Sequence, residues 1–369
     1  MLRWLALAVV MAVTPLVGLS AEPEAMKQWG SWRGPLSTGV APHGNPPSEW
    51  SEIKNVKWKS RLPGPGHSSP VVWGDVVFVT AAVPFGPKVE AKPDPDPGAH
   101  DNVPVTQKHR FVGVAFDRKT GKPLWSKTLL ETLPHEGGHY TGTLASHSPV
   151  TDGKHLFAFF GSHGLYCLDF RGDVVWSKRL GKMATKHNHG EGASPALEDG
   201  VLVVNWDHQG QSRIVAFDAS SGKIRWQADR DEVTSWSSPI VINYEGRKVV
   251  VVSGTKFLRG YELETGKVLW KCAGLSNNIV ATPVYAAGMV FAGSSYDTRI
   301  MMGVTLKGAS GDLTGTKHVA WSTRQRTPYV PSPLLYQGGL YFLRHYQGIL
   351  TRLETKTGNE ATGPFRLGG

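Results

Sequence analysis

Residues 194–227 read SPALEDGVLVVNWDHQGQSRIVAFDASSGKIRWQ and contain one complete structural repeat. Ser194-Pro195 opens a short apolar strand, and a Glu-Asp-Gly turn leads into a second strand at residues 201–206. A third strand follows at residues 213–217, and an Asp-x-x-Ser-Gly-Lys turn precedes the fourth strand, which carries Trp226. Four short strands joined by tight turns are the pattern of one propeller blade.

Both ends of this repeat recur along the chain. A small hydroxyl residue followed by Pro opens a short apolar strand at six places: Ser69, Ser148, Ser194, Ser238, Thr282 and Ser332. The phrase Asp/Glu-x-x-Thr/Ser-Gly-Lys-x-x-Trp ends at Trp125, Trp226 and Trp270. A period of 40–50 residues with several strands and one Trp indicates a β-propeller. We therefore predict an all-β fold, a β-propeller of four-stranded antiparallel blades, with about six blades visible in the chain.

The composition is that of a soluble, turn-rich protein. The 369 residues include 43 Gly and 25 Pro, as many tight turns require. The net charge of +10 comes from single Lys and Arg residues that are scattered through the turns. A basic stripe is the usual mark of a nucleic-acid surface, so we do not expect nucleic acid as a partner.

Four segments are expected. Residues 1–21 resemble a secretory signal peptide, with Arg3 before an apolar run and small residues before position 21. That run is short and broken by Pro15, which argues against a retained membrane span. The signal peptide itself predicts export to the periplasm or cell envelope. Residues 22–60 form an N-terminal strap and closing strand. Either the Trp58 strand joins the last blade and closes the ring, or it stays unpaired beside a gap left by missing blades, which is the alternative we favour. Residues 61–369 form the propeller, with a Pro-rich insertion at 84–109.

Three motifs carry a family resemblance. They are Trp32-Arg33-Gly34-Pro35, the phrase SSPVVWGD at residues 68–75, and the Thr-Gly-Lys-x-x-Trp repeats. Together they resemble the exported propellers with pyrroloquinoline-quinone (PQQ)-type repeats that are abundant in planctomycete-like bacteria. The same repeat serves the assembly factor BamB and the quinoprotein alcohol dehydrogenases. Such propellers commonly have eight blades, which implies that this chain is truncated by about two.

The resemblance also bears on cofactors. Quinoprotein dehydrogenases usually carry adjacent Cys residues in a ring disulfide under the quinone, Ca²⁺ held by Glu, Asn and Asp, and a catalytic Asp. Here Cys167 and Cys272 are isolated, so PQQ is not expected and no cofactor is predicted. A BamB-like scaffold needs no catalytic set, although this chain lacks the lipoprotein Cys near the cleavage site.

One face of the predicted propeller collects nine of the fourteen His residues, because its long inter-blade loops and hairpin tips carry them. Three interpretations remain open. The polar residues are loop filler, or they form a funnel for a protein, peptide or glycan ligand, or they bind a metal. The funnel would be lined by His139, His147, Glu191, Asp207, His208, Trp236, Arg324, Arg326 and Tyr329. The metal ligands would be His187, His189 and Glu191, whose side chains share one side of an extended segment.

The sequence therefore predicts an exported, non-catalytic binding or scaffolding propeller with BamB-like architecture. The alternative is an enzyme that uses the His-rich face, either a quinone-dependent oxidoreductase or a metal-dependent hydrolase. In either case the inter-blade loops converge near the central channel. We expect at least four of six residues to line one concavity there: His139, His147, Glu191, Asp207, His208 and Trp236.

Overall fold

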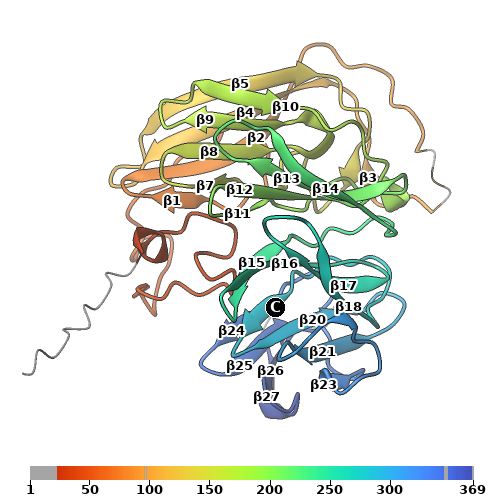
Figure 1. Cartoon of the computed structure of the whole chain (residues 1–369). Helices are drawn as coiled ribbons and strands as arrows, with labels where there is room; N and C mark the ends of the chain where they lie inside the picture. The colour runs from red at the N-terminus through yellow and green to blue at the C-terminus, as the bar shows by residue number, and fades with distance from the viewer. Residues whose placement is uncertain (1–22, 95, 97, 345–347, 368–369) are drawn as a thin grey trace, which may run out of the picture.

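The computed structural model describes residues 23–94, 96, 98–344 and 348–367, so the expected signal segment lies outside the described residues. Within them, six antiparallel sheets of four strands follow one another along the chain (Figure 1). Within each sheet the four strands of a repeat pair in the order in which they occur along the chain, as in a propeller blade. The predicted all-β propeller of four-stranded blades is confirmed.

The first three blades span residues 71–230. Their strands are β1 (Val71–Trp73), β2 (Val76–Phe85), β4 (Lys108–Asp117), β5 (Pro123–Thr132), β7 (Val150–Thr151), β8 (His155–Phe159), β9 (Leu165–Asp169), β10 (Val174–Lys178), β11 (Ala196–Glu198), β12 (Val201–Trp206), β13 (Ser212–Asp218) and β14 (Ile224–Arg230). Short 3-10 helices lie at Glu24–Lys27, Gly161–His163 and Lys186–Asn188.

The last three blades span residues 240–366. Their strands are β15 (Ile240–Tyr244), β16 (Arg247–Ser253), β17 (Phe257–Glu262), β18 (Val268–Ala273), β19 (Val284–Ala286), β20 (Met289–Ser294), β21 (Ile300–Thr305), β23 (Val319–Thr323), β24 (Leu334–Tyr336), β25 (Gly339–Leu343), β26 (Ile349–Glu354) and β27 (Glu360–Arg366). The fourth blade gains a fifth strand, β22 (Gly311–Asp312), which pairs parallel with β18.

The hydroxyls of five of the six Ser/Thr-Pro openings join neighbouring blades. The backbone amide of one opening donates a hydrogen bond to the hydroxyl of the next. Bonds of 2.8 to 3.2 Å run from Ser69 to Ser148, from Ser148 to Ser194, from Ser194 to Ser238, from Ser238 to Thr282 and from Thr282 to Ser332. The repeat therefore needs a hydroxyl at this position, because an alanine could not accept the bond.

The Trp residues of the outer strands join the blades at their rims. Four of these indole N–H groups donate to a carbonyl in the turn of the following blade. Bonds of 2.7 to 2.9 Å join Trp125 to Phe170, Trp176 to Ala219, Trp226 to Leu263 and Trp321 to Thr355. Gly266 in such a turn has φ +72°, and a Cβ there would overlap the Trp226 ring. The turn thus needs Gly both for its backbone and for the space under the indole.

Alternating side chains of the central strands form the cores between blades. In β12, Leu202 and Val204 pack against the second blade. Val201 and Val203, which point the opposite way, pack against the fourth blade. Five such clusters join the six successive blades, and a sixth lies between the strap residue Trp58 and the first blade. Such strands are buried on both faces, which explains their nearly unbroken apolar sequences.

The N-terminal strap spans the opening between the first and last blades. Its contacts run from Trp29 to Val72 in the first blade, from Gly30 to Thr151 in the second, and from Arg33 and Thr38 to Ser332, Pro333 and Leu335 in the last. Between these ends, Trp32 and Pro35 border the inner strands of the third and fourth blades. The Trp32-Arg33-Gly34-Pro35 motif is therefore the centre of a cross-link that touches blades far apart in sequence.

The Trp58 segment packs on the first blade in the position of an outer-strand Trp. Its indole donates to the Arg118 carbonyl at 2.9 Å, and its ring covers Gly121. Residues 56–60 nevertheless belong to no strand in the described part of the chain, and β27 pairs there with β26 alone. A closing ladder between this segment and the last blade is therefore absent from the described residues.

The Pro-rich insertion begins later than its composition suggested. Strands β2 and β4 keep pairing as far as Phe85 and Lys108, so the excursion covers residues 86–107. Within it, β3 (Asn102–Val103) pairs with β6 (Gly138–His139), which lies in the loop between the first and second blades. The insertion is thus folded over that loop. Across the described residues, no helix is long and apolar enough to cross a membrane.

Candidate functional site

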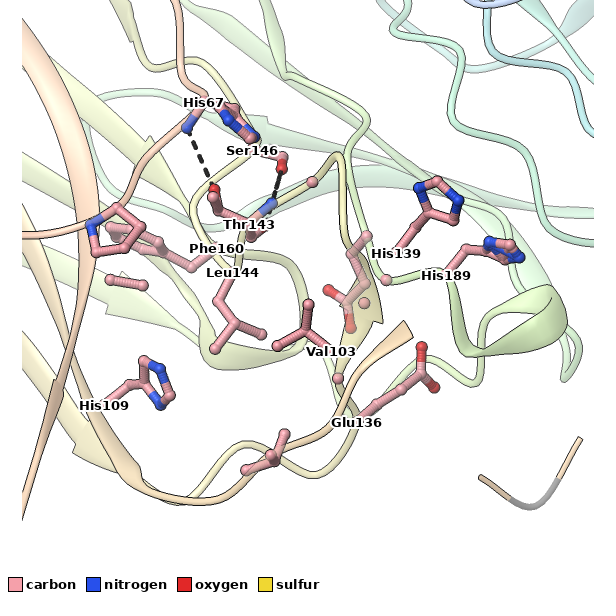
Figure 2. Close-up of a pocket in the computed structure, with 18 of the residues that line it drawn as sticks. His67, Val103, His109, Glu136, His139, Thr143, Leu144, Ser146, Phe160 and His189 are labelled. Atoms are coloured by element: carbon pink, nitrogen blue, oxygen red, sulfur yellow. Dashed lines mark hydrogen bonds between the residues drawn. The ribbon is translucent and has the colours of Figure 1, made fainter. Parts of the chain in front are cut away.

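A cavity of about 380 Å³ lies where the first two blades meet three loops, and we call it the histidine cavity (Figure 2). Its walls come from the ends of β2 and β4, residues 103–105 of the insertion, the 135–147 loop, the β8–β9 turn and residues 189–191. Seven histidines line it: His67, His109, His135, His139, His147, His163 and His189. Its two acids are Glu136 and Glu191, and Lys, Arg and Asp are absent from the described lining.

His147 and His163 are the most enclosed of these histidines. They are 2% and 8% exposed, respectively. His163 stacks on Phe111 with ring centroids 4.3 Å apart, and His147 meets the edge of Phe159 at 4.7 Å. Both nitrogens of His147 and Nε2 of His163 lack a hydrogen-bond partner among the described residues. Leaving such groups unpaired is costly, so these nitrogens are the strongest sign that the cavity accommodates something polar.

Burial also sets the charge of these rings. It lowers the pKa of His147 to about 3 and that of His163 to about 4, because water is excluded from the charged form. His189, at the other end of the cavity, has its pKa lowered to about 4 by burial and by the neighbouring imidazoles. All three rings are therefore neutral at pH 7. Each then offers one nitrogen that donates and one that accepts.

Glu191 enters the cavity over Gly161. One carboxyl oxygen accepts from the Ser162 amide at 2.7 Å, and the other lies 2.5 Å from the Ser162 hydroxyl. Burial raises the pKa of this carboxyl to about 8. Gly161 has φ +55°, and a Cβ there would collide with the carboxyl group and lie 3.2 Å from the His147 ring. The glycine therefore lets Glu191 and His147 meet above the β8–β9 turn.

Glu136 is tied to the opposite wall. Its carboxylate accepts from the amide of Thr185 at 3.1 Å and from the hydroxyl of the same residue. Burial raises its pKa, and the bonds from Thr185 act in the other direction. Glu136 thus fixes the 135–147 loop to the turn at residues 185–188, and Figure 2 shows its carboxylate on the side of the cavity away from His67.

Four imidazole rings gather where the insertion meets this turn. They are His100, His139, His187 and His189, with neighbouring ring centroids 4.7 to 6.4 Å apart. A backbone hydrogen bond also joins two of these loops, because the His139 amide donates to the His189 carbonyl at 3.1 Å. Asn102 of the insertion donates to the His187 carbonyl at 2.8 Å. The insertion, the 135–147 loop and the turn at residues 185–188 are therefore joined by hydrogen bonds into one wall of the cavity.

The proposed metal ligands do not share one side of an extended segment. Residues 186–188 form a 3-10 turn in which His187 has φ +57°, so the alternation assumed from the sequence does not hold. His187 and His189 face the His100 ring, whereas Glu191 turns toward Ser162. Nowhere in the described residues are three or more His, Cys, Asp or Glu side chains grouped as metal ligands.

The predicted ligand-binding residues fall into two groups. His139, His147 and Glu191 line the histidine cavity. His147 and Glu191, together with Asp207 and Trp236, also line an adjoining cleft of about 10 Å³, which is room for roughly one water molecule. Four of the six residues expected in one concavity are thus brought together, with Trp236 on its wall.

The roles of two of these residues are structural. Asp207 holds Arg230 with bonds of 2.7 and 3.0 Å and accepts from Ser235 at 2.6 Å, so its oxygens are already occupied. Trp236 donates its indole N–H to the Gly190 carbonyl at 2.6 Å, which positions the loop that carries Glu191. Both residues lie outside the lining of the histidine cavity and support the loops that form it.

The remaining predicted residues lie away from the cavity. His208 is at the β12–β13 tip, where Nδ1 accepts from the Gly210 amide at 3.1 Å. Arg326 pairs with Glu360 of the last blade at 2.6 Å, and Arg324 is exposed. Tyr329 stacks on Tyr296, with ring centroids 6.1 Å apart. These four residues do not line the histidine cavity.

Several cavity residues were outside the predicted ligand set. His163, Glu136 and His135 come from the same loops, but their spacing carries no motif. The one signal in the sequence that could have located the cavity was the unequal spacing of the repeats. The first two openings lie farther apart than any other two consecutive openings. Cys167 and Cys272 are buried, free and in different blades, so they do not form the adjacent-Cys arrangement typical of a quinone site. We derive no reaction step through such a cofactor.

Comparisons with known proteins complete the description. A family model described as outer membrane protein assembly factor BamB matches residues 110–362. Polyvinylalcohol dehydrogenase of Pseudomonas sp. is 25% identical over 280 residues, covering 66% of this chain and 40% of that protein. Tetrathionate hydrolase of Acidithiobacillus ferrooxidans is 26% identical over 256 residues, covering 65% and 47%. The chain thus spans less than half the length of these curated relatives.

One of the similar solved structures supports the fold. Europium-containing methanol dehydrogenase superposes with a TM-score of 0.51 at 13% identity, over 94% of this chain and 86% of that one. BamB from Moraxella catarrhalis gives a TM-score of 0.46 at 16% identity, over 69% and 72%. At such identities the first likeness shows the fold alone.

Proposed function

The chain belongs to the family of the outer membrane protein assembly factor BamB, and we propose that it is a non-catalytic binding propeller of the cell envelope that holds its ligand in the histidine cavity. One observation carries the proposal. Three ring nitrogens of His147 and His163 are deeply buried without a partner among the described residues, and they border a cavity of about 380 Å³. That volume lies within the range of small-molecule sites, roughly 300–1,000 Å³.

The polar groups of the cavity suit binding better than chemistry. Ser146, the serine of its lining, donates its hydroxyl to the Thr143 carbonyl at 2.8 Å rather than to a histidine. The same oxygen accepts from the Thr143 amide at 3.0 Å (Figure 2). Glu136 and Glu191 are engaged by Thr185 and Ser162. A nucleophile aligned with a base is therefore missing from the described lining. The expected signal at residues 1–21 and the family description both support export to the envelope.

The enzyme alternative rests on Glu191. A carboxyl group whose pKa is raised to about 8 inside a cavity is a common mark of acid–base catalysis. The curated relatives are named as a dehydrogenase and a hydrolase, and the chain spans less than half of each. A quinone-dependent oxidoreductase or a hydrolase is therefore the second candidate, and the experiment below separates the two functions.

The test is calorimetric titration of the full chain with a defined panel. The panel contains a neutral trisaccharide, a trigalacturonate, a chitosan trimer and a hexapeptide with blocked ends. We expect one class to bind with 1:1 stoichiometry, and we expect His163→Phe to weaken that binding at least tenfold. Arg324→Ala, which alters an exposed residue away from the cavity, is the control. Failure of every member to bind would refute the proposed function.

Two further measurements complete the test. Mass spectrometry of the bound ligand after prolonged incubation should show it unchanged, whereas conversion would establish the enzyme alternative. Fractionation of cells that produce the full chain should recover it in the envelope or periplasm. Recovery in the cytoplasm would contradict the proposed localisation.

A further inference from the structure

We infer that the ligand of the histidine cavity is an uncharged, hydroxyl-rich molecule of the carbohydrate class, an inference that rests on the binding function proposed above. It follows from three properties of the lining: its charge, its unpartnered hydrogen-bonding groups and its apolar walls.

The lining offers no unengaged charge to an ionic ligand, because its two acids, Glu136 and Glu191, are already held by Thr185 and Ser162. Lys, Arg and Asp are absent from the described residues that border the cavity. The enclosed imidazoles of His147 and His163 favour the neutral form, and burial likewise favours the protonated carboxyl of Glu191. A carboxylate, phosphate or ammonium group would lose its hydration without gaining a counter-charge, which is strongly unfavourable.

The unpartnered groups require a ligand that both donates and accepts hydrogen bonds. They are Nδ1 and Nε2 of His147 and Nε2 of His163 and of His189. A neutral imidazole donates from one nitrogen and accepts at the other, and a protonated carboxyl group does the same through its two oxygens. Hydroxyl groups can satisfy both roles at each contact. An aliphatic ligand would leave all four nitrogens unpaired.

The walls between these groups are apolar. Pro84, Val103, Pro104, Leu144 and Phe160 line the cavity, and Figure 2 places Val103 and Leu144 between His109 on one side and His139 and His189 on the other. Alternating hydrogen-bonding and apolar surfaces match a pyranose ring, whose hydroxyls project from its edge and whose C–H groups form its faces. A pocket of this size encloses most of such a ligand's surface.

One wall of the cavity comes from the insertion. Val103 is 57% exposed and borders the cavity, and its strand pairs with Gly138 of the 135–147 loop. Solvent therefore reaches the cavity wall at this two-stranded segment. A bulky residue at position 103 would narrow the cavity without disturbing the blade cores, because β3 packs outside all six hydrophobic clusters of the described residues.

The experiment titrates the full chain at pH 7 with cellotriose, trigalacturonate, a chitosan trimer and the blocked hexapeptide. We expect cellotriose to bind at least tenfold more tightly than the anionic and cationic trimers and the peptide. Val103→Trp and His163→Phe should each weaken cellotriose binding at least tenfold, and Val103→Trp should keep the unfolding temperature of the wild type. His208→Gln, which removes an imidazole outside the cavity, should bind as the wild type does.

The outcomes separate this inference from the function on which it rests. Equal or tighter binding of a charged trimer or of the peptide, lost in Val103→Trp, would overturn the carbohydrate assignment and leave the binding function standing. Cellotriose binding that survives Val103→Trp and His163→Phe would place the sugar elsewhere and overturn the inference as well. Failure of every ligand to bind would refute both.

Discussion

His147→Gln should make the protein markedly less sensitive to acid. The wild-type ring is 2% exposed, and burial lowers its pKa to about 3, whereas a histidine in the unfolded chain titrates near 6.5. At pH 5 this ring is therefore protonated in the unfolded chain and neutral in the folded protein. Stability from this group is fully present above pH 6.5 and is lost as pH falls toward 3.

The magnitude follows from the two pKa values. Between pH 7.5 and pH 5, the difference in proton binding at this single ring removes about 2 kcal/mol of unfolding free energy, because the unfolded ring is almost fully charged at pH 5. Gln keeps a side chain that donates and accepts but does not titrate. The loss of stability between the two pH values should therefore be about 2 kcal/mol smaller in the variant.

The assay is urea unfolding followed by Trp fluorescence at both pH values. His43→Gln, in the exposed strap, is the matched control for removing one imidazole, and any change it causes is subtracted. Parallel losses of stability in the wild type and His147→Gln would refute the reasoning, because they would mean that the ring is charged or hydrated in the folded protein.

Three further predictions concern stability measured in the same way. Glu191→Gln should be more stable than the wild type by up to about 3 kcal/mol at pH 7 and equal to it near pH 4. The reason is that the raised pKa of Glu191 makes the stability contribution of this carboxyl group fall as pH rises from 4.5 to 8. A difference in stability between variant and wild type that does not change with pH would contradict this. Arg33→Ala should cost about 2–3 kcal/mol by cutting charged hydrogen bonds to the last blade, and no loss would show the strap to be dispensable. Gly266→Ala should cost more than Gly246→Ala, because both have positive φ but the first alone overlaps an indole; equal costs would show that the Trp ring moves freely.

The fold could be predicted because every blade of a propeller makes similar contacts with its neighbours, so the residues that make these contacts recur along the sequence. Five of the six blades have a Gly turn under an indole, so the Thr-Gly-Lys-x-x-Trp phrase recurs and marks the outer strand. The Ser/Thr-Pro openings recur for a reason that the sequence alone did not reveal. Their hydroxyls accept amide bonds from the preceding blade, a contact between residues at least 44 positions apart.

The site could be predicted only in part because its geometry depends on loops. The His187 turn has positive φ, so the His187–Glu191 segment does not alternate as an extended chain would. Asp207 looked available in sequence, but Arg230 lies 23 residues later, and only the antiparallel register of β12 and β13 with β14 brings the two together. Pairings of this kind are set by tertiary packing, which residue spacing does not encode.

The position of the histidine cavity follows from where the repeat is irregular. The first two openings are the most widely spaced, and the additional residues lie in the insertion and in the 135–147 loop. These two segments pair through β3 and β6, and the second is bonded to the turn at residues 185–188. Extra chain from adjacent blades meets at this place and encloses the volume, on a rigid scaffold whose loops are the usual location of binding residues. The place lies between the first two blades, and the buried, unpartnered histidines are found there.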